Sequence, residues 1–132
     1  GNLGTILRTA DALEIPVILL DGCADAYNPK TVRASMGAVF RTQPQHLTRE
    51  AAVAACQEAG IPLLATAMSS DAADLREADL GASAVIIGSE GQGICQTLFD
   101  AAEQKIIIPM SPRCESLNAA VAATIVMWQM KR

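Results

Sequence analysis

The chain has 132 residues, of which 51% are hydrophobic and 3% aromatic, with a formal net charge of −4. This length suits one domain whose core is built from Ala, Val, Ile and Leu, as where helices pack on a parallel sheet. The negative net charge, taken alone, argues against a nucleic-acid partner, because polyanions bind basic surfaces.

The charges are unevenly distributed along the chain. No acidic residue occurs in the segment from Tyr27 to Arg49, which contains the cations Lys30, Arg33, Arg41 and Arg49. Seven of the fourteen acidic residues lie between positions 71 and 103. Because the local field decides where a polyanion binds, the basic segment is a candidate RNA-contacting surface. An ordinary solvated surface is the alternative.

The cysteines and the histidine do not form a metal-binding pattern. The four cysteines lie far apart without a C-x-x-C pair, and His46 is the one histidine. Zinc requires clustered ligands, so we expect no metal.

Nothing resembles a signal peptide, and the apolar run at 117–130 is too short to span a bilayer. We expect a soluble, cytoplasmic protein with reduced thiols and no membrane partner.

The first half of the chain predicts alternating helices and strands. Asn2, followed by apolar residues at helical spacing, predicts a helix that Asn2 caps, with Arg8 off its apolar stripe. Asn28 and Pro29 are typical of the start of a short helix. The other predicted elements are strands at 17–20, 38–40 and 63–66, and a helix from 48 or 49 to 59 that Gly60 closes.

The second half predicts two buried strands, at 84–87 and 106–108, after a polar, acidic connection at 69–80. A helix from about 94 to 103 separates the strands. Ser116 is expected to cap a last helix that is apolar nearly all round, which therefore needs cover on more than one side. A second subunit is the cover that we expect. The alternation of elements predicts an α/β fold with a parallel sheet.

Each of these two strands is followed directly by a break, a short segment whose residues end the strand. Ligands of open α/β sheets bind beyond the carboxyl ends of the strands, where these breaks lie. The first break, 88–93, reads G-x-x-G-x-G and contains Glu90. The dinucleotide fingerprint is G-x-G-x-x-G, and a carboxylate repels a pyrophosphate. The glycines instead allow backbone to approach a ligand, and Glu90 suits a cationic or hydroxyl-bearing one. A domain that binds NAD or ATP is thus the least favoured alternative, and a simple turn is another.

Several stretches together resemble a known family. IIGSEGQG, IIIPM and SLNAAVAA resemble the second and third motifs of the SPOUT superfamily in its SpoU/TrmH branch. GNLGTILRTADA is similar to the first motif of that branch, Asn-x-Gly followed by Arg-Thr, and YNPKTVRASMGAVF to a further segment. The resemblance covers essentially the whole chain. It implies RNA ribose 2′-O-methylation, on ribosomal or transfer RNA, with S-adenosyl-L-methionine as cofactor. A non-catalytic SPOUT-like paralogue that binds RNA is the alternative.

The resemblance also implies an architecture, a parallel-sheet α/β knot with Rossmann-like layers and a deep C-terminal trefoil knot. It implies a homodimer through the last helix and the first, in which Arg8 of one subunit approaches the cofactor of the other. Family members carry a strand before the first motif, and many have an N-terminal RNA-binding domain. We therefore expect residues 1–132 to be a catalytic domain that lacks these parts.

The resemblance assigns roles to individual positions. Arg8 matches the arginine that the family places beside the target ribose. Two roles remain open for it, general-base catalysis and electrostatic stabilisation of the alkoxide. The electrostatic role is favoured because a guanidinium stays protonated. Asn2, Glu90, Ser116 and Asn118 match the other polar positions, with Glu90 and Asn118 as hydrogen-bond acceptors; Ser116 as a helix cap alone is the alternative. The implied cofactor positions are Thr66, Ala67, Gly88, Glu90, Gly91, Ile108, Met110, Ser116 and Leu117. The implied RNA contacts are Arg8, Lys30, Arg33 and Arg41.

One loop departs from the family pattern. Where many members have a glycine before Ser-Leu-Asn, this chain has Pro112-Arg113-Cys114-Glu115. The change bears on how the loop covers the methionine end of the cofactor.

Overall fold

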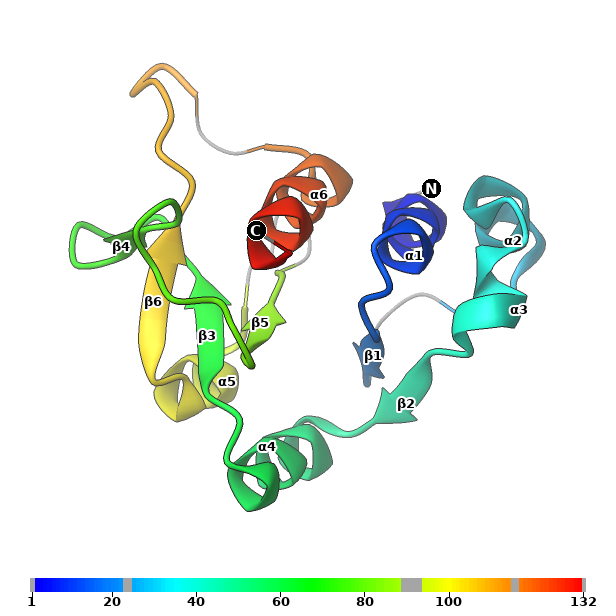
Figure 1. The fold of residues 1–132 in the computed structure, drawn as a ribbon, viewed down its shortest axis with the longest axis horizontal. Coiled ribbons are helices and arrows are strands. Elements are labelled where there is room, and N and C mark those ends of the chain that lie inside the picture. The colour runs from blue at the N-terminus through cyan, green and yellow to red at the C-terminus, as the bar shows by residue number, and fades with distance from the viewer. Residues whose placement is uncertain (1, 23–24, 89–93, 115–116, 132) are drawn as a thin grey trace. The chain divides into compact units, whose positions relative to one another are not determined.

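The computed structural model describes residues 2–22, 25–88, 94–114 and 117–131. They fall into two compact units, Gly1–Ala52 and Val53–Arg132 (Figure 1). The boundary lies within helix α4, Arg49–Ala59. That residues 1–132 form one catalytic domain stays a prediction.

The first unit combines helices with a short parallel sheet. Its elements are α1 Asn2–Ala12, β1 Ile18–Leu20, α2 Pro29–Ser35, α3 Ala38–Thr42 and β2 Gln45–Leu47. Strand β1 pairs with β2 in parallel, with Ile18 opposite Gln45. The buried side chains of Leu7, Leu19 and Val39 form the core, which joins α1, β1 and α3.

Helix α2 begins as its sequence predicts. The Asn28 side chain accepts a hydrogen bond from the Thr31 backbone N–H over 2.9 Å, and Pro29 occupies the first turn, where no N–H is needed. Asn2, in contrast, does not precede its helix: it is the first residue of α1. The prediction that Asn2 caps α1 is therefore wrong.

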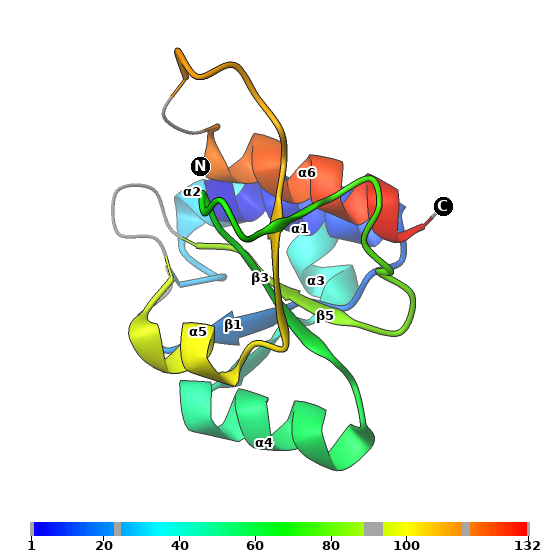
Figure 2. The ribbon, with the colours of Figure 1, turned by 90° about the vertical axis from the view of Figure 1, so that its left-hand side faces the viewer.

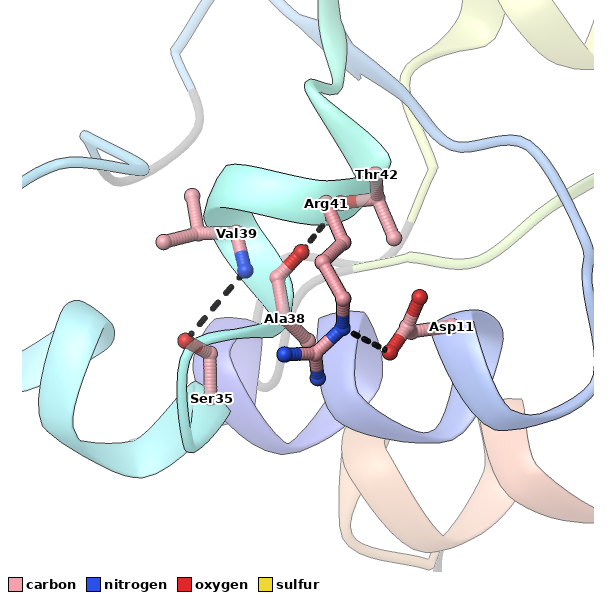
Figure 3. Close-up of polar contacts among 6 residues, drawn as sticks. All are labelled: Asp11, Ser35, Ala38, Val39, Arg41 and Thr42. Atoms are coloured by element: carbon pink, nitrogen blue, oxygen red, sulfur yellow. Dashed lines mark hydrogen bonds and ion pairs between the residues drawn. The ribbon is translucent and has the colours of Figure 1, made fainter.

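Residues 38–40 form helix α3 and not the predicted strand. Ser35, which is fully buried, accepts a hydrogen bond from the Val39 N–H over 3.4 Å (Figure 3). Gly37 has a φ of 84°, so the chain can turn directly from α2 into α3. A run of three apolar residues cannot distinguish helix from strand by itself. The actual strand, β2, is polar and exposed at Gln45 and His46 and gives no apolar signal.

The second unit is a four-stranded parallel sheet with helices. The strand order is β4-β6-β3-β5, and every neighbouring pair is parallel. The elements after α4 are β3 Leu63–Thr66, β4 Ala73–Asp74, β5 Ala84–Ile86, α5 Gln96–Ala101, β6 Gln104–Ile107 and α6 Ala119–Met130. The predicted parallel α/β arrangement is confirmed. Since all four strands run the same way, their carboxyl ends lie at the same edge of the sheet.

The edge strand β4 lies inside the segment that the sequence predicted as a plain connection. It has two residues, too few for a periodic pattern. Just beyond it, the Arg76 guanidinium bonds to the Asp74 carboxylate over 2.6 Å and holds the pKa of Asp74 below its ordinary value.

Helix α6 closes the core of the second unit. Val126 is 1% exposed and packs with Leu64, Leu75, Leu80 and Ile106. The cap of α6 is Asn118, whose Oδ1 accepts hydrogen bonds from the N–H groups of Ala120 and Val121. The sequence predicted Ser116 as the cap; Ser116 lies outside the described residues. Figure 2 shows the segment after β6 extending past the strand end before the chain reaches α6.

Candidate cofactor and RNA-contacting sites

The carboxyl ends of β6, β3 and β5 are neighbours in the sheet, because β3 lies between the other two. Thr66 at the end of β3 is opposite Ile106 of β6, and Ala65 is opposite Ile86 of β5. Three separate segments of the predicted cofactor site therefore emerge at one edge. The predicted positions on them are Thr66, Ala67, Gly88, Ile108 and Met110, all half-buried.

Two of these positions also hold the strands together. The Thr66 hydroxyl donates to the Ile86 carbonyl over 3.1 Å, and the Ala67 N–H donates to the Ile106 carbonyl over 2.9 Å. The hydroxyl proton of Thr66 is therefore used within the sheet. The Ile108 side chain packs against the core of the second unit, and both Ile108 and Met110 remain half-buried beside the backbone that this edge offers a ligand.

The loop after β5 carries two predicted site residues, Glu90 and Gly91. Both lie outside the described residues, as does Ser116, so their roles stay predictions. Leu117 is half-buried where the chain reaches α6.

Asn118 is exposed, but its acceptor capacity is used. Its Oδ1 lies 2.8 Å from the Ala120 N and 3.3 Å from the Val121 N. An amide oxygen has two lone pairs, and two backbone donors fill them. In this structure both acceptor positions of Asn118 are thus used by α6, and its Nδ2 group is the part that can donate to a ligand; the predicted acceptor role of Asn118 toward the cofactor or a ribose hydroxyl stays a prediction.

Arg8 lies exposed on α1, and the packing of that helix explains why. Leu7 and Ala10 are fully buried on the inner side. Gly4 lies against α2 so closely that an added Cβ would be 2.6 Å from the Ala34 Cβ and 2.6 Å from the Thr31 carbonyl oxygen. Gly4 thus fixes the face that α1 turns outward. The position of Gly4 in the stretch that resembles the family's Asn-x-Gly motif could have identified it as a residue of the site region. The spacing of the residues alone predicts no role for Gly4.

The four cations of the basic segment divide into two pairs. Arg41 forms an ion pair with Asp11 over 2.8 Å (Figure 3), and Arg49 with Asp21 over 3.7 Å. Lys30 and Arg33 are exposed on α2 and form no ion pair with any residue in the described ranges. The charge that is free to attract a polyanion is thus concentrated on α2.

In the described residues, neither the cavity beside Cys56 nor any metal-binding cluster or membrane-spanning helix points to a site at the strand ends. A cavity of about 330 Å³ is lined by residues including Cys56, Ile61 and Leu63, next to the start of β3 and not its end. In the described ranges no three His, Cys, Asp or Glu side chains gather in a way that could hold a metal. Within the same ranges, no helix is both long enough and apolar enough to cross a membrane.

Comparisons with known proteins agree with the sequence motifs. The model of the SpoU rRNA Methylase family matches residues 1–128. The chain is 33% identical over 132 residues to the 23S rRNA (guanosine(2553)-2′-O)-methyltransferase RlmP of Bacillus subtilis, covering 99% of this chain and 53% of that protein. It is 31% identical to the human mitochondrial rRNA methyltransferase 3, covering 100% of this chain and 44% of that protein. The chain thus spans about half the length of these relatives.

Solved structures give the same result. The AdoMet-bound rRNA methyltransferase from Sinorhizobium meliloti is similar with a TM-score of 0.90 and 33% identity, over 98% of this chain and 50% of that one. The SpoU methyltransferase AviRb from Streptomyces viridochromogenes, in complex with AdoMet, has a TM-score of 0.86 and 32% identity, over 98% and 54%.

Proposed function

We propose, from the premise that this chain belongs to the SpoU rRNA Methylase family, that it methylates a ribose 2′-hydroxyl of ribosomal or transfer RNA. The observation that carries the proposal is the meeting of β3, β5 and β6 at one sheet edge. The segments that follow these strands include two of the family's motif stretches. S-adenosyl-L-methionine is the proposed methyl donor; two similar methyltransferase structures contain AdoMet.

The described residues at this edge fit such a cofactor. Gly88 has no side chain, so a ligand can approach its backbone, and backbone N–H and C=O groups can bind adenine edges. The half-buried side chains of Ile108 and Met110 offer an apolar wall. Leu117 completes the proposed set. The cofactor, when bound, supplies a methyl group activated by a sulfonium centre.

Arg8 is the proposed catalytic residue on the RNA side. A guanidinium stays protonated in proteins, which makes it a poor general base. It can instead fix a phosphate next to the target ribose and stabilise the alkoxide as the hydroxyl loses its proton. The exposure of Arg8 on α1 supports this electrostatic role.

We also propose that the active form is a homodimer through α6. Val121, Ile125 and Trp128 are 48%, 38% and 64% exposed, and their spacing places them on one face of the helix. Three apolar side chains on one outward face favour cover by a second copy of the chain. Arg8 of one subunit would then serve the cofactor of its partner.

The trefoil knot that the family resemblance implies is a further part of this proposal. The TM-score of 0.90 to a family structure supports a shared path of the chain. A crystal structure of the protein tests it: a last segment that does not thread through a loop of the chain would contradict the knot.

Calorimetry and methyl transfer together test the function. We expect S-adenosylmethionine to bind with a dissociation constant of about 1 µM, roughly −8 kcal/mol, and NAD and ATP not to bind. RNA from a methylation-deficient strain should accept radiolabelled methyl groups. The Arg8→Ala variant should lose methyl transfer and keep its cofactor affinity, because the proposed contacts of Arg8 are with the RNA phosphate and the forming alkoxide and not with the cofactor.

Three outcomes would contradict parts of this proposal. A folded sample that binds neither the cofactor nor its demethylated product would refute the cofactor assignment. Turnover unchanged in Arg8→Ala would refute the role of Arg8. RNA binding without cofactor binding or methyl transfer would instead favour the non-catalytic paralogue.

A further inference from the structure

The outward side of α2 and its flanks carries a surface with two kinds of side chain. Lys30 and Arg33 lie three residues apart on this side, whereas Thr31 and Ser35 are buried on the other. Exposed apolar side chains lie at both ends of the helix and on α3. We name this surface the aromatic–basic patch, made of Tyr27, Lys30, Arg33, Met36 and Phe40.

The apolar members of the patch are unusually accessible. Tyr27 is 50% exposed and Phe40 59%, and their ring centroids lie 6.2 Å apart at an interplanar angle of 42°. Met36 is 65% exposed. Rings that stay in water forgo the stabilisation that burial gives them. Two rings held side by side in solvent therefore indicate a surface that another molecule covers.

The charged members favour an anionic occupant. Lys30 and Arg33 have no acidic partner in the described part of the chain. The acidic residue nearest to Lys30 and Arg33 in the sequence is Asp25. Its Oδ1 accepts a hydrogen bond from the Tyr27 backbone N–H over 3.0 Å, and within the described ranges it forms no ion pair with either cation. An apolar protein surface would leave both cations unpaired, and an RNA duplex would leave both rings without bases, since its bases stack on each other. A single strand uses both kinds of side chain, phosphates on the cations and bases on the rings.

We propose that the aromatic–basic patch binds single-stranded RNA next to the nucleotide that is methylated. The proposal rests on the proposed function and names its substrate class: a loop or bulge whose bases are unstacked. The patch and Arg8 belong to the same compact unit, and the close contact at Gly4 holds α1 against α2. The patch can therefore hold the strand at a fixed place relative to Arg8.

Three RNA probes separate stacking from charge. Fluorescence anisotropy would measure the binding of labelled oligoadenylate of about twelve nucleotides, of a duplex of the same length, and of an abasic strand with the same phosphates. Wild-type protein should bind oligoadenylate more tightly than either other probe. Tyr27→Ser/Phe40→Ser should weaken oligoadenylate binding about tenfold for each ring removed and leave abasic binding unchanged.

The two cations should act on all three probes. Lys30→Ala/Arg33→Ala should weaken binding of each probe and lower the salt slope of single-strand binding by roughly 0.7 for each phosphate that is no longer neutralised. Matched controls change exposed residues elsewhere: Ile61→Ser for an apolar side chain and Arg76→Ala for a cation already paired with Asp74. Neither control should change RNA binding. Circular dichroism should give the same unfolding temperature for the patch variants and wild type.

Two results would overturn the proposal. If Tyr27→Ser/Phe40→Ser binds oligoadenylate as wild type does, the rings do not stack on bases. If that variant instead changes the mass measured by light scattering, the patch is a contact between copies of the chain. Cofactor calorimetry on the same samples separates these failures from failure of the proposed function, because cofactor binding does not involve the patch.

Discussion

Arg41 on α3 donates a hydrogen bond from its Nε to the Oδ2 of Asp11 on α1, over 2.8 Å (Figure 3). Arg8 precedes Asp11 by three residues on the same helix, a spacing at which opposite charges pair. Asp11 can thus neutralise either arginine, and in the structure Arg41 holds it. We infer that this ion pair keeps Arg8 available for RNA. The predicted direct RNA contact of Arg41 is expected to matter less than those of Lys30 and Arg33.

The first prediction follows from this competition. Arg41→Ala releases Asp11 to pair with Arg8 and should lower methyl transfer several-fold, whereas the double variant Arg41→Ala/Asp11→Asn should recover it. Stability should change little, since an exposed ion pair contributes about 0–1 kcal/mol. Turnover of the three proteins on the same RNA, with thermal unfolding alongside, checks this.

Arg49→Ala is the matched control, because Arg49 pairs with Asp21 in the same unit. It should leave turnover unchanged. Loss of activity in Arg41→Ala that Asp11→Asn does not repair would mean that Arg41 acts directly, as the sequence predicted.

The second prediction concerns the contact between α1 and α2. A Cβ at position 4 would lie 2.6 Å from both the Ala34 Cβ and the Thr31 carbonyl oxygen. Gly4→Ala should therefore lower the free energy of unfolding by about 1–3 kcal/mol, the usual cost of overpacking. Gly81→Ala is the control, since its new Cβ would come no closer than 3.4 Å to the Asp79 carboxylate. Denaturant titration of both variants measures the difference; equal stability would show that the helices move apart freely.

The parts of the fold that the sequence predicts correctly are those with redundant local signals. The start of α2 combines a capping side chain, Asn28, with Pro29 in the first turn, and the end of α4 has Gly60 with a φ of 68°. Strand β3 is an apolar run bounded by turn residues. In each case, local conformation and burial favour the same structure.

Prediction from the sequence is wrong where tertiary contacts determine which secondary structure forms. The apolar run at 38–40 becomes helical because Ser35 and Gly37 redirect the chain, and β2 forms beside β1 without an apolar pattern. For the site, motif resemblance places the cofactor positions at strand ends that prove to be neighbours. It could not reveal that Asn118 uses its acceptor to cap α6, or that Arg41 is bound to Asp11, since neither contact has a periodic signature.

The third prediction separates the two faces of α6. Val126 does not belong to the exposed face of α6, because it is 1% exposed inside the chain's own core, and Val126→Glu therefore tests the core. A carboxylate there would be buried without a partner, and the variant should lose several kcal/mol of stability. Val121 is 48% exposed, so Val121→Glu should remain folded and become monomeric.

Light scattering and circular dichroism on both variants check this. A folded, monomeric Val126→Glu would mean that the packing of α6 differs from the structure. A Val121→Glu protein that keeps the mass of a dimer would place the subunit contact on another surface. A monomeric wild type would contradict the proposed dimer itself.

The last prediction asks whether Asn118 acts on the cofactor or only on α6. Asn118→Ala removes the acceptor of the Ala120 and Val121 N–H groups and should cost about 1 kcal/mol of stability. Asn118→Asp keeps that acceptor, adds a negative charge that suits a helix N-terminus, and removes only the Nδ2 donor. If Asn118 serves as a cap alone, Asn118→Asp should match wild type in stability and in cofactor affinity. If its amide also donates to the cofactor, stability should be kept while affinity falls about tenfold, the usual effect of removing one hydrogen bond. We expect the second result, because Asn118 is exposed at the end of the segment that follows β6, and calorimetry on the three proteins distinguishes the two.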